Sequence, residues 1–253
     1  MTSAAPLLAL EGVGKRYGAV EALSGVSFAV GAGETLAICG DNGAGKSTLI
    51  RIVSGAQPPS AGTIRLGGAP VTFASPADAL AQGVATIYQD LALAPTMTIA
   101  QNVFLGSELR RRVLPGLYVL DKRRMAREAA AHLARLRLAV PDMGRRVADL
   151  SGGQRQAVAI ARALRWQARI VIMDEPTAAL GVRETRLVLS LIKEIAAQGI
   201  TVILISHNMA DVVEVAERAL VLKAGRLVRD TPLDGWTADD LSHVIMSHET
   251  AAA

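Results

Sequence analysis

A glycine-rich segment at residues 40–48 has the composition of a phosphate-binding loop. Its glycines allow backbone N–H groups to point inward without a Cβ in the way, so that these groups can hold phosphate oxygens. Lys46 adds a full positive charge near the β- and γ-phosphates of a nucleotide, and the hydroxyl of Ser47 suits a Mg²⁺ ion. The predicted nucleotide-binding residues are Gly40, Asn42, Gly43, Ala44, Gly45, Lys46, Ser47 and Thr48.

Two adjacent carboxylates follow an apolar run at residues 169–173 and are suited to phosphoryl transfer. Asp174 can reach a Mg²⁺ ion, often through a water molecule. Glu175 points in a different direction, so it can orient and activate a water. Phosphoryl transfer needs little covalent help, and positioning and charge neutralisation therefore carry the rate. We predict Asp174 as a metal ligand and Glu175 as a catalytic residue; the alternative is a solvated strand end with two surface acids.

A second glycine motif, made of Ser151, Gly152, Gly153 and Gln154, precedes a helical pattern at residues 155–164. Serine is a favoured residue at the N-cap of a helix. The N-terminus of such a helix attracts anions, so the Ser151 hydroxyl and the Gly153 N–H are predicted to face outward as a second anion site. Taken alone, the same motif also fits a capped helix that binds no ligand.

The elements around these motifs are those that the chemistry requires. Residues 35–39 form a short apolar run before the first loop, and residues 46–53 have apolar positions at helical spacing. A strand, a glycine loop and a helix in this order are the context that distinguishes a phosphate-binding loop from a turn with a surface lysine. The apolar runs at 169–173 and 201–205 predict strands buried on both faces, in a mostly parallel sheet.

Strand and helix patterns divide the chain into three parts. Residues 1–88 alternate short strands with glycine turns, residues 89–165 read as helices, and residues 166–230 return to strand–helix alternation, which argues for a parallel sheet covered by helices. The predicted helices are residues 99–106, 121–138, 152–164, 183–197 and 237–248. Residues 224–226 are predicted to form a hairpin turn, and the 251–253 tail is expected to be frayed.

Both glycine motifs in this order, with the acidic pair after the second, resemble the ATP-binding-cassette ATPases. The resemblance covers residues 7–230, nearly the whole chain. It implies an α/β fold with a P-loop NTPase (RecA-like) core, a mostly parallel sheet, an N-terminal antiparallel β region and an inserted α-helical subdomain. The single domain would then combine a nucleotide-binding lobe, residues 1–88 and 166–253, with a helical subdomain at 89–165. The implied cofactors are ATP and Mg²⁺.

Three further residues receive roles from this resemblance. Gln89 follows the apolar run at 84–88 and is expected to contact Mg²⁺ and the attacking water, at the start of the segment that touches a membrane partner. His207 ends the strand pattern at 201–206 and is expected to contact the γ-phosphate as a catalytic residue. Tyr17 is expected to stack on the adenine; the alternative is a tyrosine packed on the sheet.

The resemblance also implies a dimer. In this family the second glycine motif closes over the ATP held by the other chain. One copy of each motif therefore predicts a head-to-tail pair, a homodimer, with two ATP molecules at the interface. One position departs from the family pattern: Gly181 stands where most cassettes carry an aspartate that couples the two sites, and a glycine cannot make that polar contact.

Two short stretches point to the transported solute. Residues 176–181 and 205–209 look like the variant found in many monosaccharide-uptake ATPases. We therefore predict the ATP-hydrolysing subunit of a monosaccharide importer, held at the cytoplasmic face of the plasma membrane by a permease and served by an external solute-binding protein. Alternatives are an importer or exporter of another solute, a soluble cassette ATPase acting on nucleic acid or in assembly, and a regulatory nucleotide-binding module without turnover. No direct contact with nucleic acid is expected.

Composition is compatible with this interpretation. The chain has 253 residues, of which 51% are hydrophobic and 3% aromatic, and no apolar run approaches the ~18 residues of a membrane span. The N-terminus does not resemble a signal peptide. Cys39 is the single cysteine, which excludes internal disulfides and fits a reducing cytoplasm, and it is expected to be a small core residue. The net charge is +4, and the basic clusters at 110–112 and 122–124 fit either a solvated face or contact with lipid head groups.

Overall fold

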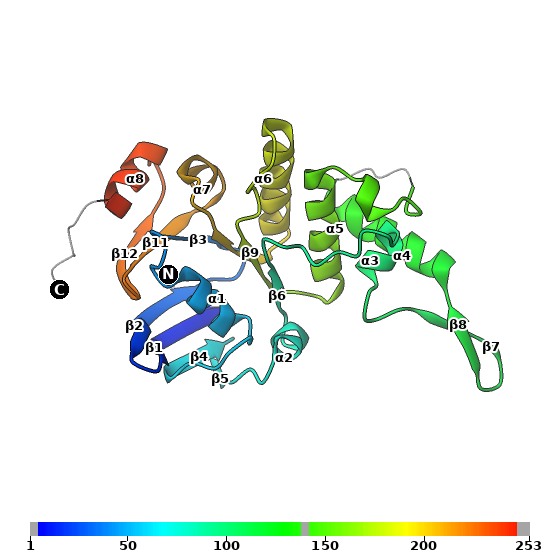
Figure 1. Ribbon diagram of the computed structural model, residues 1–253, viewed down its shortest axis with the longest axis horizontal. Helices are drawn as coiled ribbons and strands as arrows, with labels where there is room; N and C mark the ends of the chain where they lie inside the picture. Colours follow the sequence, from blue (N-terminus) through cyan, green and yellow to red (C-terminus); the bar gives the residue numbers. More distant parts are fainter. Residues whose placement is uncertain (1–4, 138–141, 247–253) are drawn as a thin grey trace.

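The computed structural model describes residues 5–137 and 142–246 (Figure 1), and structural statements refer to these ranges. The strands are β1 (Leu8–Tyr17), β2 (Val20–Val30), β3 (Thr35–Cys39), β4 (Ala61–Leu66), β5 (Ala69–Val71), β6 (Val84–Ile87), β7 (Arg110–Leu114), β8 (Leu117–Leu120), β9 (Ile170–Asp174), β10 (Thr201–Ile205), β11 (Arg218–Lys223) and β12 (Arg226–Pro232). The helices are α1 (Lys46–Val53), α2 (Pro76–Ala81), α3 (Ile99–Val103), α4 (Lys122–Arg135), α5 (Gly152–Arg165), α6 (Val182–Ala197), α7 (Met209–Val215) and α8 (Ala238–Met246), with a 3₁₀ turn at Val147–Asp149.

The central sheet has the strand order β12-β11-β3-β10-β9-β6. Strands β11, β3, β10, β9 and β6 are parallel to one another, and only the edge strand β12 pairs antiparallel. Every residue of β3 and β10 is buried, as expected for strands covered on both faces. The predicted mostly parallel sheet is confirmed, and β3 and β10 have the predicted bounds.

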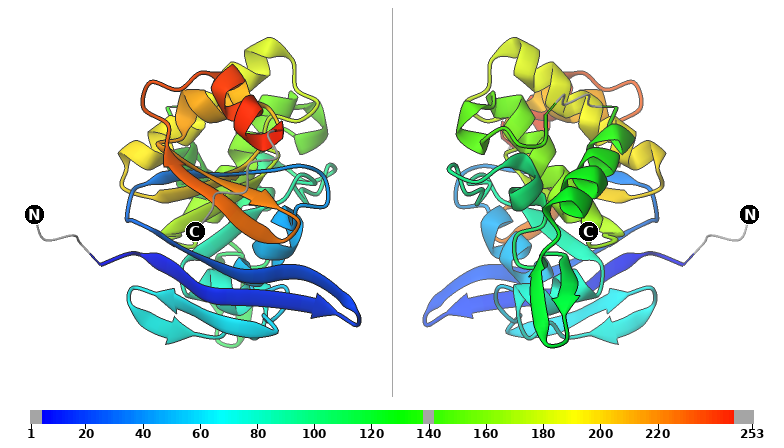
Figure 2. Two further views of the ribbon diagram at one scale, coloured as in Figure 1. Left: turned by 90° about the vertical axis from the view of Figure 1, so that its left-hand side faces the viewer. Right: turned by 90° about the vertical axis from the view of Figure 1, so that its right-hand side faces the viewer.

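Each face of the central sheet contacts a different hydrophobic cluster. Leu36 and Ile38 of β3 point toward α1 and the N-terminal antiparallel sheet, which has the order β2-β1-β4-β5. Ala37 and Cys39 point the other way, toward α5 and α6. Figure 2 shows the N-terminal sheet as a separate layer beside the central one. Burial raises the pKa of the Cys39 thiol to about 12, so Cys39 is the predicted small core residue.

Helices α3, α4 and α5 pack together beyond strand β6 (Figure 1). Their core includes Phe104, Met125 and Ile160, which are almost fully buried. The expectation that residues 89–165 contain only helices is wrong for one stretch, because β7 and β8 form a hairpin between α3 and α4. The sequence Pro115-Gly116 makes the turn, with Gly116 at a φ of 81°, and the flanking valines and tyrosine favour strands.

The remaining elements match the predicted ones with shifted ends. The turn between β11 and β12 has Ala224 and Gly225 both in the left-handed region, at φ 45° and 78°, which confirms the predicted hairpin. Helix α8 accounts for most of the predicted final helix and begins one residue later than predicted; residues 247–248 of that prediction, the 251–253 tail and residue 138 lie outside the described residues. Helices α2 and α7 were not predicted. No helix of the described ranges is long and apolar enough to cross a bilayer.

Candidate functional site

The phosphate-binding loop between β3 and α1 has a backbone that only glycine can adopt at two positions. Gly40 has a φ of 145°, and a Cβ there would collide with the carbonyl oxygen of Leu222. Gly45 has a φ of 104°, and a Cβ there would lie 2.7 Å from the side chain of Leu23. Gly45 is also the N-cap of α1 and supplies no side-chain cap, so the first N–H groups of this helix are available to an anion.

The ammonium group of Lys46 lies across the same loop. Its Nζ donates hydrogen bonds to the carbonyl oxygens of Gly40, at 2.6 Å, and Asp41, at 2.9 Å. Beside it is a cavity of about 330 Å³. The cavity is lined by Ala22, Asn42, Gly43, Ala44, Gly45, Lys46, Ser47, Thr48, Gln89, Asp174, Glu175 and Ile205. The fold therefore brings the predicted loop residues together with Gln89 and both carboxylates.

The two carboxylates at the end of β9 have different surroundings. Burial raises the pKa of Asp174, the neighbouring Glu175 raises it further, and Lys46 and Arg51 partly oppose both effects. Glu175 has a left-handed φ of 52°, and its N–H donates to the carbonyl of Ile205 at 2.9 Å. The chain therefore turns sharply after Asp174, which explains why the two side chains point in different directions.

One oxygen of Glu175 is a buried acceptor without a donor. Its Oε2 forms no hydrogen bond with any described residue. The Nδ1 of His207 lies 2.6 Å away, but the two groups are not oriented as a hydrogen bond. The His207 ring itself is largely exposed. A buried carboxylate oxygen that accepts no hydrogen bond is costly in a folded protein, and since Glu175 lines the cavity, this oxygen is suited to accept one from a ligand or water.

These features fit a bound nucleotide with its metal ion. The glycine positions leave a cradle that a Cβ would fill, and the N–H groups and Lys46 supply the positive charge that phosphates need. Ser47, Gln89 and Asp174 line the same cavity and carry oxygen atoms, the ligand type that Mg²⁺ prefers.

The second glycine motif caps α5 as predicted. The Ser151 Oγ accepts a hydrogen bond from the N–H of Gln154 at 3.4 Å, and the Gln154 Oε1 accepts one from the N–H of Ser151 at 3.1 Å. This reciprocal pair is a capping box. Ser151 is exposed, and none of the four motif residues lines the cavity beside Lys46.

A residue that the sequence reasoning missed covers the N-terminus of α5. The Glu184 Oε1 accepts a hydrogen bond from the N–H of Gly152 at 3.0 Å, and its Oε2 accepts one from the N–H of Gly181 at 3.3 Å. The hydrogen bond from Gly181 is the main cause of a lowered pKa at Glu184. One carboxylate thus joins the second glycine motif to the loop before α6. The spacing of Gly181 and Glu184, an N-cap and the third helical residue, was the available signal.

The glycines of the second motif are also needed for packing within the chain. A Cβ at Gly152 would collide with the side chain of Leu180. A Cβ at Gly153 would lie 3.1 Å from the side chain of Leu187 and 3.4 Å from the Cα of Glu184. The missing side chain of Gly153 therefore helps α5 to lie close to α6, and that of Gly152 leaves room for Leu180, which precedes α6.

Besides the second glycine motif, the predicted residues Gly40, His207, Tyr17 and Gly181 do not line the cavity. Tyr17 is 43% exposed, and its hydroxyl donates a hydrogen bond to the Oε1 of Gln57 at 2.7 Å. Its proposed contact with adenine stays a prediction. Gly181 has an extended backbone, and a Cβ built there meets no atom within 4 Å.

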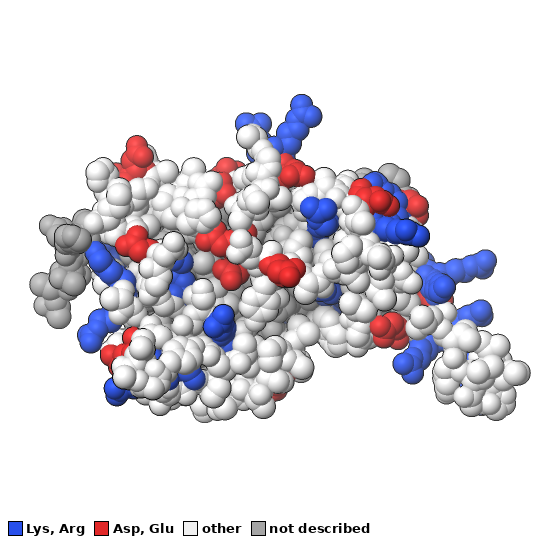
Figure 3. Space-filling model, viewed as in Figure 1, with Lys and Arg blue, Asp and Glu red and all other residues white. Residues whose placement is uncertain are grey.

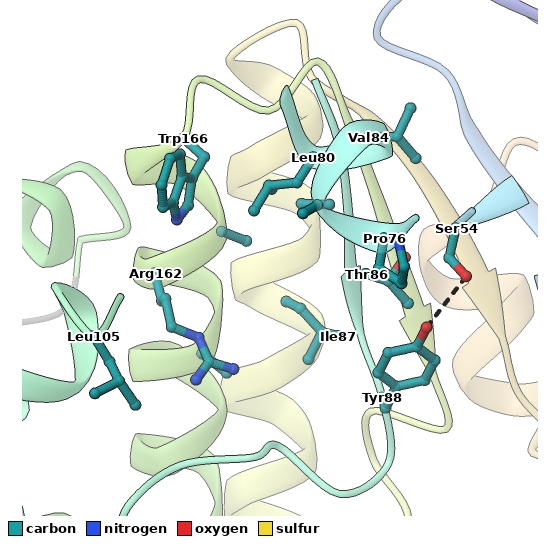
Figure 4. Close-up of a pocket in the computed structure, with 14 residues that line it drawn as sticks. Ser54, Pro76, Leu80, Val84, Thr86, Ile87, Tyr88, Leu105, Arg162 and Trp166 are labelled. Atoms are coloured by element: carbon teal, nitrogen blue, oxygen red, sulfur yellow. Dashed lines mark hydrogen bonds between the residues drawn. The ribbon is translucent and has the colours of Figure 1, made fainter. Parts of the chain in front are cut away.

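A second cavity, of about 320 Å³, lies where α2 and β6 face α5 (Figure 4). The Tyr88 hydroxyl and the Ser54 hydroxyl are 3.1 Å apart on one side, and Leu105 and Trp166 lie on the other. Arg162 projects between them and donates to the carbonyl oxygens of Leu91 and Ala92, both at 2.8 Å. Burial lowers the pKa of Arg162. The lining of this cavity includes Tyr88, the residue before Gln89, but shares no residue with the lining of the nucleotide cavity.

A family profile described as ABC transporter matches residues 23–178, more than half of the chain. The chain therefore belongs to the ABC transporter family, and it is an ATPase of this family that hydrolyses ATP for transport. This confirms the predicted resemblance and the predicted enzyme class. The roles of individual site residues stay predictions.

Three individual relatives show which members of the family this chain resembles. The fructose import ATP-binding protein FrcA of Rhizobium meliloti is 48% identical over 87% of this chain and 86% of its own length. The xylose/arabinose import ATP-binding protein XylG of Sulfolobus acidocaldarius is 43% identical, over 95% of this chain and 94% of its own length. The ribose import ATP-binding protein RbsA 2 of Rhizobium etli is 42% identical over 97% of this chain, which spans only 47% of that relative.

Solved structures confirm the fold. A nucleotide-free ATP-binding cassette from an ABC transporter superposes with a TM-score of 0.78 at 26% identity, covering 97% of each chain. A cassette in its ADP conformation gives 0.80 at 26% identity, covering 97% and 96%. A dimeric cassette in a post-hydrolysis state, bound to ADP and Pi, gives 0.73 at 27% identity, covering 90% of this chain and all of that one.

Glu184→Ala should loosen the contact between α5 and the loop before α6. The N–H groups of Gly152 and Gly181 would both lose the carboxylate as their hydrogen-bond acceptor. Amide hydrogen exchange at these two glycines should therefore accelerate at least tenfold, and the ATPase rate should fall. Glu184→Gln keeps one acceptor oxygen and should show an intermediate effect. The exposed Glu217→Ala serves as the matched control. Unchanged exchange at both glycines in Glu184→Ala would contradict this bridging role.

Asp174→Asn should stabilise the nucleotide-free protein while weakening its binding of Mg-ATP. The raised pKa means that the ionised carboxylate costs stability at neutral pH, and this cost disappears as the pH falls through the folded-state pKa. At pH 7.5 Tm should rise by less than about 4 °C, the upper shift for 1 kcal/mol in a chain of this size. The gain should shrink at acidic pH, and exposed Asp234→Asn should change Tm little. A lower Tm for Asp174→Asn would show that the carboxylate is net stabilising.

Proposed function

We propose that this chain is the ATP-hydrolysing subunit of a monosaccharide importer. The observation that carries this proposal is the similarity to fructose and xylose/arabinose import ATP-binding proteins over nearly the full length of both chains. Residues 176–181 and 205–209 carry the variant sequences expected of such ATPases. The first stretch directly follows Glu175 and the second begins at Ile205, and both of these residues line the nucleotide cavity. The sugar itself would pass through a separate permease, after capture by an external solute-binding protein.

The nucleotide cavity supplies each requirement of ATP hydrolysis. The loop at residues 40–48 would bind the phosphates, and Ser47, Gln89 and Asp174 would hold Mg²⁺, which neutralises charge on the β- and γ-phosphates when bound. The Oε2 of Glu175, which accepts no hydrogen bond from a described residue, is suited to accept one from the attacking water and so to orient it. His207, 2.6 Å from this oxygen, would contact the γ-phosphate from the end of β10.

Two chains are proposed to close on two ATP molecules. In one chain the second glycine motif is absent from the lining of the nucleotide cavity, so its exposed Ser151 is available to a nucleotide held by another chain. A related cassette forms a dimer with ADP and Pi bound, which supports a homodimer here. Gly181 offers no side chain for coupling the two sites, and Glu184 provides the connection within each chain between this loop and Gly152.

The second cavity is the proposed docking site for the permease. It lies between the nucleotide-binding core and the helical segment, and its lining includes Tyr88, the residue directly before Gln89. Leu105 and Trp166 give it an exposed apolar wall, and an apolar segment of a permease would cover these side chains. A shift of the helical segment during ATP binding would change the width of this cavity. Through this contact the chain would be held at the cytoplasmic face of the membrane, without contacting nucleic acid.

Glu175→Gln should bind Mg-ATP but hydrolyse it at least about a hundredfold more slowly, because the water loses the carboxylate that orients it. In light scattering this variant should be a monomer without nucleotide and a dimer with Mg-ATP. Adding Ser151→Ala to the Glu175→Gln chain should weaken the dimer if Ser151 contacts ATP across the interface. A wild-type rate for Glu175→Gln would assign the water-orienting role to another residue.

Gly181→Asp should fold normally, because the backbone is extended and a side chain meets no neighbour. An aspartate at this N-cap also suits α6. The ATPase rate against ATP concentration should show a changed Hill coefficient with little change in nucleotide affinity, while Gly181→Ala, which adds no polar group, should match the wild type. Identical curves for all three proteins would mean that position 181 takes no part in coupling.

A further inference from the structure

The β7–β8 hairpin projects from the helical segment, at the end of the molecule far from the nucleotide loop (Figure 1). A hydrogen bond from the N–H of Asp121 to the carbonyl of Leu109, 2.8 Å long, closes its root. Every residue of both strands is exposed, including Leu114 at 59% and Leu117 at 49%. The hairpin therefore contributes nothing to the core, and its apolar side chains are unused by the fold and by the nucleotide site.

Polarity changes along the length of this hairpin. The root half of β7 is Arg110, Arg111 and Arg112, and the tip consists of Val113, Leu114, Pro115, Gly116 and Leu117. Across the ribbon, Arg110 lies opposite Leu120, Arg111 opposite Val119, and Arg112 opposite Tyr118. Successive residues of a strand point to opposite faces, so the arginine side chains of the root project from both faces of the hairpin.

This pattern differs from that of a ribbon that packs on a protein surface. Such a ribbon has one apolar and one polar face, because a protein groove covers one face and water the other. In the β7–β8 hairpin, neither face is polar along its whole length. Instead, the side chains change from charged at the root to apolar at the tip. An environment that surrounds the tip on all sides and turns polar toward the root matches this arrangement.

We propose that the tip of the β7–β8 hairpin inserts into the head-group region of an anionic phospholipid bilayer, with the arginines of the root at the lipid phosphates. Arg112 and Leu114 are two residues apart, which spans about 7 Å in a strand. Peripheral elements bury their apolar side chains about 5–10 Å into the same boundary. Tyr118, opposite Arg112, has the amphipathic ring that is enriched at this level.

The charge around the root agrees with an anionic partner. Residues 108–128 contain seven Lys and Arg against three Asp and Glu, an excess that equals the net charge of +4 of the whole chain. Lys122 and Arg123 are exposed at the start of α4, whereas Arg124 is paired with Glu128 at 2.7 Å. In Figure 3 the projecting end carries no charged colour and Lys and Arg gather behind it. A net positive root favours anionic lipid over neutral lipid.

The biological setting rests on the proposed function, since a permease would bring the chain to a membrane, but lipid binding by the isolated chain needs neither permease nor hydrolysis. The test is co-sedimentation of the full chain with vesicles of phosphatidylglycerol and phosphatidylcholine, and with vesicles of phosphatidylcholine alone. The protein should sediment with the anionic vesicles and much less with the neutral ones. The ATPase rate of each protein is measured in parallel, so that failure of the nucleotide site is distinguished from failure of lipid binding.

Two sets of variants separate tip from root. Leu114→Ser with Leu117→Ser should lower the partition coefficient at least tenfold. Arg110→Gln, Arg111→Gln and Arg112→Gln together should lower it about a hundredfold, because each arginine near an anionic surface contributes roughly a fivefold factor. The controls change exposed residues elsewhere and should bind as the wild type does. They are Val20→Ser with Met246→Ser for the tip, and Arg183→Gln, Arg186→Gln and Arg226→Gln for the root.

A fluorescence measurement reports how deeply the tip of the hairpin enters the bilayer. Tyr118→Trp should give fluorescence that brominated phospholipid quenches beyond the quenching of Trp166 and Trp236 in the parent chain. Equal binding to neutral vesicles, retained binding in the tip variant, or no additional quenching would each overturn the proposal. Binding of the hairpin only in the presence of a reconstituted permease would also overturn it and would assign the hairpin to a protein contact.

Discussion

The parallel pairing of β3, β10 and β9 is the constraint on which the nucleotide site depends. Ile205 lies opposite both Ile38 and Asp174 in the sheet, so the three strands end at the same edge. The phosphate-binding loop, the carboxylate pair and His207 each follow one of these ends, and the register alone brings together groups more than a hundred residues apart. Burial on both faces holds the register, because a slip of one residue would exchange the sides facing the two hydrophobic clusters.

Glycines allow the close approaches around this edge. Gly40 and Gly45 let the loop pass next to β11 and β2, and Gly152 and Gly153 let α5 pack against α6. Gly45 also leaves the first N–H groups of α1 without a side-chain cap, so the residue that permits close packing is the one that keeps these groups available to an anion. Glu184 accepts a hydrogen bond from the N–H of Gly152 and another from the N–H of Gly181, and so ties the second glycine motif to the loop before α6.

The two cavities and the hairpin, to which three kinds of contact are assigned in our proposals, lie on different parts of the chain. The nucleotide cavity lies at the strand ends, the second cavity lies between α2 and α5, and the hairpin projects beyond α4. Core strands and the first loop were predictable from sequence because continuous apolar runs and glycine spacing are local signals. The β7–β8 hairpin was missed because its arginines and short strands resemble the exposed face of a helix, and the short helices α2 and α7 have too few turns for a periodic pattern.

The sequence by itself determined the class of protein, since the order and spacing of two glycine motifs and an acidic pair are readable without coordinates. It also determined the Ser151 cap of α5 and the buried strands, because a cap or an apolar run depends on neighbouring residues. Only the tertiary structure decided that Glu184 bridges two loops, that Glu175 keeps a buried oxygen without a hydrogen bond, and that Tyr17 forms a hydrogen bond with Gln57. These facts depend on distances between segments far apart in the chain, and on which polar atoms the packing leaves without partners. No local pattern records either quantity.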